Sequence, residues 1–207
     1  MLGRHEQRQA RKRATAVAKA LFSSVSMPDP VTVETVCATL AAHRGRAIRL
    51  IPMSTLDIDQ PPFSGVWLAG RETDYVFFDD AWPRLAVRNA ILHELGHILL
   101  DHRSNGRLTD LMVIMMKQVI PAASPAALRS TVQAGLCRTN GVAAAEIDTD
   151  PVHELEAELL AAELGTKWSD PARRPTAART GAQDDTVLRR VAGAMDYGLG
   201  LPADRTL

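Results

Sequence analysis

Two histidines and a glutamate carry the clearest chemical signal in this sequence. His93, Glu94 and His97 form an H-E-x-x-H motif inside a mostly apolar stretch. On a helix, the i, i+4 spacing places both imidazoles on one face, where they can bind a single metal ion. Glu94 lies about 100° further round the helix, so it can reach a water on the metal without being a ligand. The motif therefore predicts a metal site with Glu94 as general base.

A catalytic zinc ion usually has three protein ligands, so the two histidines need a third donor. The residues after His97 do not continue in the metzincin pattern, because Arg103 stands where that pattern requires a histidine. His102 comes one position too early and is predicted to face another side of the helix. We expect it to be a helix-end histidine, favoured there by the helix dipole.

An acidic segment, residues 151–164, is the more natural source of the third ligand. Glu154 and Glu158 share one face at i, i+4 spacing and border the apolar stripe of this predicted helix. Glu156 points away from that face and is expected to be solvated. Helical geometry leaves both Glu154 and Glu158 open as the ligand.

The two segments together resemble the ImmA/IrrE family of zinc metallopeptidases. Residues 93–97 read HELGH and are followed by ILLDH, and residues 154–164 read ELEAELLAAEL. The family's second helix has the pattern E-x-x-A-x-x-F-A-A-x-L-L, whose first glutamate is the third zinc ligand. Aligned on the alanines, that glutamate is Glu154. The chain departs from the pattern at Leu160, where the family often has phenylalanine, and at Gly165, where Gly-Thr-Lys replaces Leu-Met-Pro.

This resemblance implies a zinc-dependent endopeptidase with a zincin-like fold, in which Glu94 is the catalytic base. The implied Zn²⁺ ligands are His93, His97 and Glu154. The substrate is expected to lie extended along an edge strand, here residues 64–69, which begins with Ser64, Gly65 and Val66. The family also implies a regulatory protein as substrate, such as a helix-turn-helix repressor or an antitoxin of a toxin-antitoxin system.

The rest of the chain is expected to hold these residues on helices around a small sheet. Hydrophobic periodicity predicts helices at 14–22, 32–43, 85–100, 107–120, 125–138, 151–164 (ending at Gly165) and 186–199. Apolar and β-branched runs predict three strands at 47–53, 63–69 and 75–78. The predicted fold class is α+β. The expected organisation is a basic helix or tail at 1–26, the zincin-like metallopeptidase domain at 27–168, and a linker with a C-terminal helix at 169–207.

Composition excludes several classes of protein. The 207 residues carry 24 basic and 24 acidic side chains, so direct nucleic-acid binding is not expected, and the basic cluster Arg4–Arg13 is interpreted as a solvated or disordered tail. No apolar run reaches the ~18 residues of a membrane span. The N-terminus lacks the apolar core of a secretory signal, so we expect a cytoplasmic protein without a membrane partner. Cys37 and Cys137, the two cysteines, are expected to be small core residues.

Two functions fit these observations. The first is the zinc endopeptidase. The second is a regulator without proteolytic activity, which keeps a metal-stabilised fold and acts by binding a partner protein or DNA. A Glu94→Gln substitution distinguishes them, because it should preserve metal binding and abolish hydrolysis.

Overall fold

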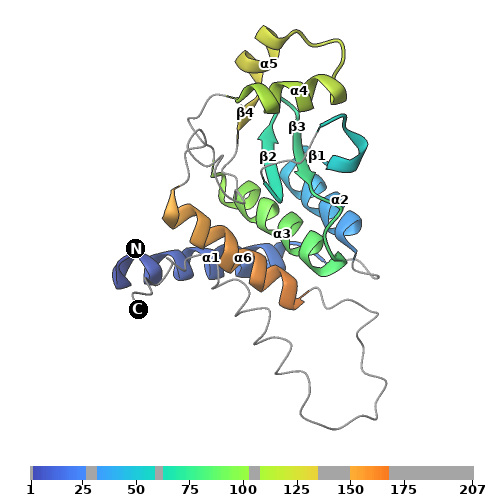
Figure 1. The fold of residues 1–207 in the computed structure, drawn as a ribbon. Coiled ribbons are helices and arrows are strands. Elements are labelled where there is room, and N and C mark those ends of the chain that lie inside the picture. Colours follow the sequence, from blue (N-terminus) through green and yellow to red (C-terminus); the bar gives the residue numbers. More distant parts are fainter. Residues whose placement is uncertain (1, 27–31, 59–62, 103–107, 135–149, 168–207) are drawn as a thin grey trace, which may run out of the picture. The chain divides into compact units, whose positions relative to one another are not determined.

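The computed structural model describes residues 2–26, 32–58, 63–102, 108–134 and 150–167. The chain divides into two units, Met1–Ala172 and Arg173–Leu207, and all described residues belong to the first. This unit mixes helices and strands, as predicted (Figure 1). The predicted helix at 186–199 and Cys137 lie outside the described residues.

A mixed sheet of four strands forms the middle layer of the first unit. The strands are β1 (Ala47–Pro52), β2 (Gly65–Ala69), β3 (Thr73–Phe78) and β4 (Gln133–Ala134), in the order β1-β3-β2-β4. β3 pairs in parallel with β1 and antiparallel with β2. The three predicted strands are present, but β4 lies in a segment predicted to be helical. That prediction is wrong at residues 132–134, because Val132 has an extended backbone and buries its side chain, and its remainder, residues 135–138, lies outside the described residues.

The described helices surround this sheet (Figure 1). They are α1 (Arg4–Ser24), α2 (Val33–Arg44), the short 3-10 helix η1 (Met53–Thr55), α3 (Arg84–Leu100), α4 (Asp110–Val119), α5 (Pro125–Thr131) and α6 (Pro151–Lys167). Thr32 caps α2 by accepting a hydrogen bond from the backbone N–H of Thr35, and Gly45 ends it with a φ of 65°. α6 continues through Gly165, where the sequence predicts its end. None of the described helices has the length and apolar character needed to cross a membrane.

Each face of the sheet packs on its own hydrophobic core, because side chains alternate along β2 and β3. Trp67, Val76 and Phe78 point to the face covered by α1, α2, α3 and α6. Val66 and Phe77 point to the opposite face, which is covered by α4 and α5 through side chains that include Met112, Met115, Met116 and Leu128. All five residues of β2 are buried, as expected for a strand covered on both faces.

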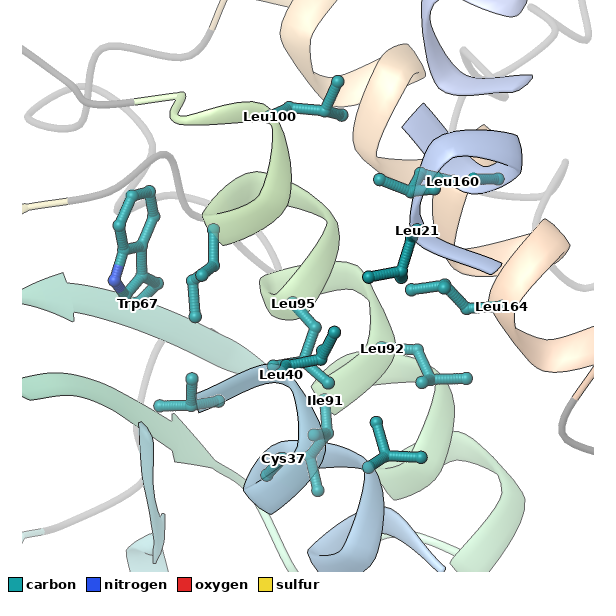
Figure 2. Close-up of a cluster of buried hydrophobic side chains, with 14 of the residues drawn as sticks. Leu21, Cys37, Leu40, Trp67, Ile91, Leu92, Leu95, Leu100, Leu160 and Leu164 are labelled. Atoms are coloured by element: carbon teal, nitrogen blue, oxygen red, sulfur yellow. The ribbon is translucent and has the colours of Figure 1, made fainter. Parts of the chain in front are cut away.

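Helix α6 packs against both α3 and α1. Figure 2 shows Leu160 and Leu164 of α6 beside Leu21 of α1, with Leu92 of α3 close by. The basic residues at 4–13 therefore belong to a helix packed on the core rather than to a disordered tail. Cys37 lies in the same core, as predicted.

A buried carboxylate ties β2 and β3 to the end of α2. Asp74 is fully buried and accepts two hydrogen bonds from Arg46, with Nε–Oδ2 and Nη2–Oδ1 distances of 3.2 and 3.0 Å. It also accepts one from Trp67 Nε1 at 3.1 Å. These contacts hold Trp67 in place on β2, next to the helix that carries the H-E-x-x-H motif.

Candidate metal centre

The H-E-x-x-H motif lies in the buried half of α3, between the sheet and α6. Every residue from Ile91 to Ile98 is buried, and His93, Glu94 and His97 are 7%, 1% and 0% exposed. The i, i+4 spacing brings the two imidazoles together as expected, with 3.0 Å between His93 Nε2 and His97 Nε2. Polar side chains this deeply buried require partners, and α6 supplies one.

Glu154, in the first turn of α6, faces the two histidines. Its Oε2 lies 3.3 Å from His93 Nε2, and its Oε1 lies 3.5 Å from His97 Nε2. Glu158, the other carboxylate that spacing left open, is exposed. The structure therefore brings together His93, His97 and Glu154 from two helices about sixty residues apart in the chain, and these residues can hold a metal ion.

The geometry of these three side chains fits a tetrahedral metal. Ligand atoms about 2.0–2.2 Å from a tetrahedral zinc ion lie roughly 3.3–3.6 Å from one another. The two Nε2 atoms are 3.0 Å apart, and each of them has one Glu154 oxygen near that range, Oε2 at 3.3 Å from His93 and Oε1 at 3.5 Å from His97. Glu154 Oε1 is also buried without a hydrogen-bond partner among the described residues. A buried carboxylate oxygen beside two imidazoles is costly unless a cation satisfies it, so the donor set fits a metal.

A glycine sets the position of Glu154. A Cβ atom added at Gly96 would lie 2.8 Å from the carbonyl oxygen of Ala157 and 3.1 Å from its Cα atom. The two helix backbones are therefore so close at Gly96 that a side chain of any size there would prevent this approach. Ala157 follows Glu154 by one turn of α6, so this contact determines which face of α6 meets the histidines.

Glu94 lies at the other side of α3, against β2. A Cβ atom at Gly65 would be 3.1 Å from Glu94 Oε1, so the absence of a side chain there leaves room for the carboxyl group. Burial raises the pKa of Glu94 well above its usual value, the charge of Glu154 adds to this, and a hydrogen bond from the Trp67 backbone opposes it. Glu94 Oε2 is buried without a hydrogen-bond partner among the described residues.

The predicted edge strand requires a correction. β2 lies between β3 and β4, so it is not an edge strand along its whole length. β4 pairs only with Leu68 and Ala69 at the end of β2, because it has just two residues. In the described part of the chain, Gly65 and Val66 have no strand partner on the β4 side. On the β3 side, the backbone oxygen of Ser64 accepts a hydrogen bond from Asp79 N at 3.0 Å, next to the pair Gly65–Phe78.

A second group of side chains lies behind the first, and the sequence analysis missed it. His102 and Glu156 are 2% and 3% exposed, and His102 Nε2 lies 2.8 Å from Glu156 Oε2. The same oxygen accepts a hydrogen bond from Arg13 Nη1 of α1 at 3.0 Å. His102 Nδ1 lies 3.1 Å from His97 Nδ1. His102 does lie at the end of α3, as predicted, but the prediction that it faces away from the other histidines is wrong, and so is that of a solvated Glu156.

The end of α3 explains why His102 reaches His97. Asp101 has a φ of 52°, and the backbone N–H of His102 then donates to the carbonyl oxygen of His97 at 3.0 Å. This left-handed turn folds His102 back under the last turn of the helix. A signal existed in the sequence, because aspartate tolerates the left-handed conformation better than most residues.

The second group of His102, His153 and Glu156 also contains three potential metal ligands. The rings of His102 and His153 are stacked, however, with centroids 4.2 Å apart and planes 19° apart. A metal ion lies in the plane of each imidazole that binds it, and nearly parallel stacked planes do not meet at one ion. This group is therefore better suited to hydrogen bonding than to metal binding.

Comparisons of the chain with protein-family models, with curated proteins and with solved structures gave no match. The interpretation of the site depends on its geometry and on the residues described above.

Proposed function

We propose that this chain is a cytoplasmic zinc-dependent endopeptidase with a zincin-like fold, related to the ImmA/IrrE metallopeptidases. One observation carries the proposal. His93, His97 and Glu154 converge from two helices with donor atoms within 4.8 Å of one another, and Glu94, buried on the same helix as the two histidines, has one carboxylate oxygen, Oε2, without a hydrogen-bond partner among the described residues. This is the residue set that metal-assisted peptide hydrolysis requires.

Three side chains would hold the metal. Two imidazole nitrogens and one carboxylate oxygen form the ligand set of many catalytic zinc sites, which keep a fourth position open. Held by these residues, Zn²⁺ would supply Lewis-acid chemistry, which makes water easier to deprotonate near neutral pH. Gly96 sets the spacing between the helices that carry the ligands, so the site is organised by the packing of α3 on α6.

Glu94 would accept and return the proton. Its Oε2 has no hydrogen-bond partner among the described residues, so that atom is available to take a proton from the attacking water. Burial raises the pKa of this carboxyl group, which favours retention of the proton by Glu94 until it is transferred to the leaving amine. The Trp67 backbone and the small Gly65 keep the carboxyl group oriented along β2.

The substrate would be an extended peptide beside the first half of β2. Backbone groups around Ser64, Gly65 and Val66 are expected to pair with it as a short added strand. The close approach of Gly65 to Glu94 then places a peptide carbonyl within reach of the base. The resemblance to the family supports a regulatory protein as the substrate, in particular a helix-turn-helix repressor or antitoxin.

The experiment incubates the full chain and Zn²⁺ with the proteins encoded by the neighbouring genes, among which a helix-turn-helix regulator is the expected substrate. Specific fragments should appear by mass spectrometry with wild-type protein and disappear with excess chelator. Glu94→Gln should bind Zn²⁺ as wild type does, measured by chelator competition, and should cleave roughly 10²–10⁴-fold more slowly. Cleavage by Glu94→Gln at the wild-type rate would refute Glu94 as the base. A biological effect that survives Glu94→Gln would refute the enzyme and favour the regulator that acts by binding.

A matched pair of variants on α6 tests the third ligand. Glu154→Gln removes the carboxylate that faces the histidines and should weaken Zn²⁺ binding at least 10-fold. Glu158→Gln makes the same chemical change one turn away, on an exposed side chain, and should leave Zn²⁺ affinity unchanged. Equal affinities for the two variants would remove Glu154 from the site.

A further inference from the structure

The candidate ligand His97 is hydrogen-bonded on both sides of its ring. Its Nε2 faces His93 and Glu154, and its Nδ1 lies 3.1 Å from Nδ1 of His102. A neutral imidazole carries one hydrogen, on either nitrogen. A metal ligand needs its coordinating nitrogen bare, so the position of that hydrogen decides whether His97 Nε2 can bind a metal.

The contact between the two Nδ1 atoms has room for one hydrogen. It belongs either to His97 or to His102, and the two cases differ in consequence. If His97 carries it, His97 Nε2 is bare and faces the metal site. If His102 carries it, a neutral His97 has its hydrogen on Nε2, and that atom cannot coordinate.

Glu156 distinguishes these cases. Its Oε2 accepts a hydrogen bond from Arg13 Nη1 at 3.0 Å and lies 2.8 Å from His102 Nε2. A carboxylate paired with arginine only accepts hydrogen bonds, so His102 must present an N–H at Nε2. The Nδ1 of a neutral His102 is then bare and accepts the hydrogen of His97 Nδ1.

We infer that Arg13, Glu156 and His102 form a hydrogen-bonded chain that holds His97 in the tautomer with a bare Nε2, ready to bind a metal. These three are positioning residues, since they act on the metal site only through His97. The inference rests on the proposed metal site for its purpose, although the hydrogen positions follow from the hydrogen bonds alone.

The surroundings of the chain support it. His97 and His102 are 0% and 2% exposed, so both rings are buried together with these partners. Arg13 also donates to the carbonyl oxygen of Leu100 at 3.3 Å, which fixes the guanidinium at the end of α3. His153 stacks on His102 and covers the ring without a hydrogen bond to it in the described structure.

Nitrogen NMR of the full chain reads the tautomers directly. In ¹⁵N-labelled protein treated with chelator, long-range ¹H–¹⁵N spectra should show hydrogen on His97 Nδ1 and on His102 Nε2. Hydrogen on His97 Nε2, or on both nitrogens of His102, would overturn the inference. This measurement needs neither metal nor substrate, so it can fail while zinc binding and cleavage are intact, and it can succeed while they fail.

Two aromatic substitutions provide a matched comparison. His102→Phe removes the acceptor of His97 Nδ1–H and should lower Zn²⁺ affinity by roughly 10–100-fold, as for other partners of histidine ligands. His153→Phe keeps a ring stacked in the same place and leaves the chain intact, so its Zn²⁺ affinity and His97 tautomer should match wild type. Equal affinities for wild type and His102→Phe would overturn the inference. If His102→Phe does not fold, the wild-type spectrum still decides.

Discussion

Replacing Gly96 by alanine tests whether the packing of two helices controls the metal centre. The added Cβ atom would lie 2.8 Å from the carbonyl oxygen of Ala157 and 3.1 Å from its Cα atom. Non-bonded atoms prefer about 3.5 Å or more, so α6 must retreat by roughly 0.5 Å at this point. Glu154 lies one turn before Ala157 and would move with it, away from His93 and His97.

The expected magnitudes follow from two opposing effects. Overpacking of a close contact costs about 1–3 kcal/mol of the free energy of unfolding. Replacing glycine by alanine inside a helix contributes about 1 kcal/mol in the other direction. The net effect of Gly96→Ala on the free energy of unfolding is therefore a loss of about 0–2 kcal/mol. Zn²⁺ affinity should fall at least ~10-fold, because sites of this kind tolerate displacements of only about 0.5 Å.

Gly165→Ala is the matched control. Gly165 also lies within a helix of this pair, but a Cβ atom there would be 3.6 Å from Leu92 Cδ1, an ordinary contact. The control should gain about 1 kcal/mol from helix propensity. The two variants should then differ by about 1–3 kcal/mol, or roughly 2–12 °C in Tm.

Thermal unfolding in chelator and Zn²⁺ competition assays measure both effects. The Tm is measured in the absence of metal, so that a change in Zn²⁺ affinity does not contribute to the difference in Tm. If Gly96→Ala matches Gly165→Ala in Tm and binds Zn²⁺ as wild type does, the helix contact does not position Glu154.

Three further predictions concern the core, the ion pair and the metal. Burial raises the pKa of Cys37 to about 12, so this thiol should stay protonated and unreactive in the folded protein at pH 8. In a Cys137→Ser background, a thiol reagent at pH 8 should therefore label Cys37 only on unfolding, and rapid labelling of the folded protein would contradict this. Because the folded state keeps that proton and the unfolded state loses it, Cys37 should make the free energy of unfolding fall as pH rises from about 9 to 12. Arg13→Ala should lower the free energy of unfolding by about 1–3 kcal/mol, since it leaves Glu156 buried without its cation. Arg11→Ala, on the exposed face, should change the free energy of unfolding by less than about 0.5 kcal/mol. Urea denaturation of the two variants should show that difference. Zn²⁺ at 100 times its dissociation constant should stabilise the fold by about 2.7 kcal/mol, and a Tm insensitive to Zn²⁺ would exclude binding to the folded state.

Local patterns predicted the parts of the site that lie within one element. The pairing of His93 with His97 needs only the geometry of a single helix, and the structure has it. The strands and most helices likewise follow from periodicity over five to fifteen residues. β4 was missed because two residues carry no periodicity, and its place beside β2 depends on where α5 ends.

The choice between Glu154 and Glu158 needed information from outside the helix. Both border the same apolar stripe, and helical geometry treats them as equivalent. The close contact of Gly96 with Ala157 fixes how α6 is rotated and displaced against α3, and this places Glu154 at the histidines and leaves Glu158 exposed. A contact between residues sixty positions apart is not visible in the periodicity of either segment.

The prediction of a solvated Glu156 holds only for a helix with one buried face. Residues two positions apart on a helix point about 200° away from one another, so Glu154 and Glu156 cannot both face α3. α6 also packs on α1, and that second buried face accommodates Glu156 beside Arg13. The basic N-terminal helix therefore belongs to the surroundings of the candidate metal centre. Its Arg13 neutralises the carboxylate that orients His102, and through His102 it affects the histidine proposed to bind zinc.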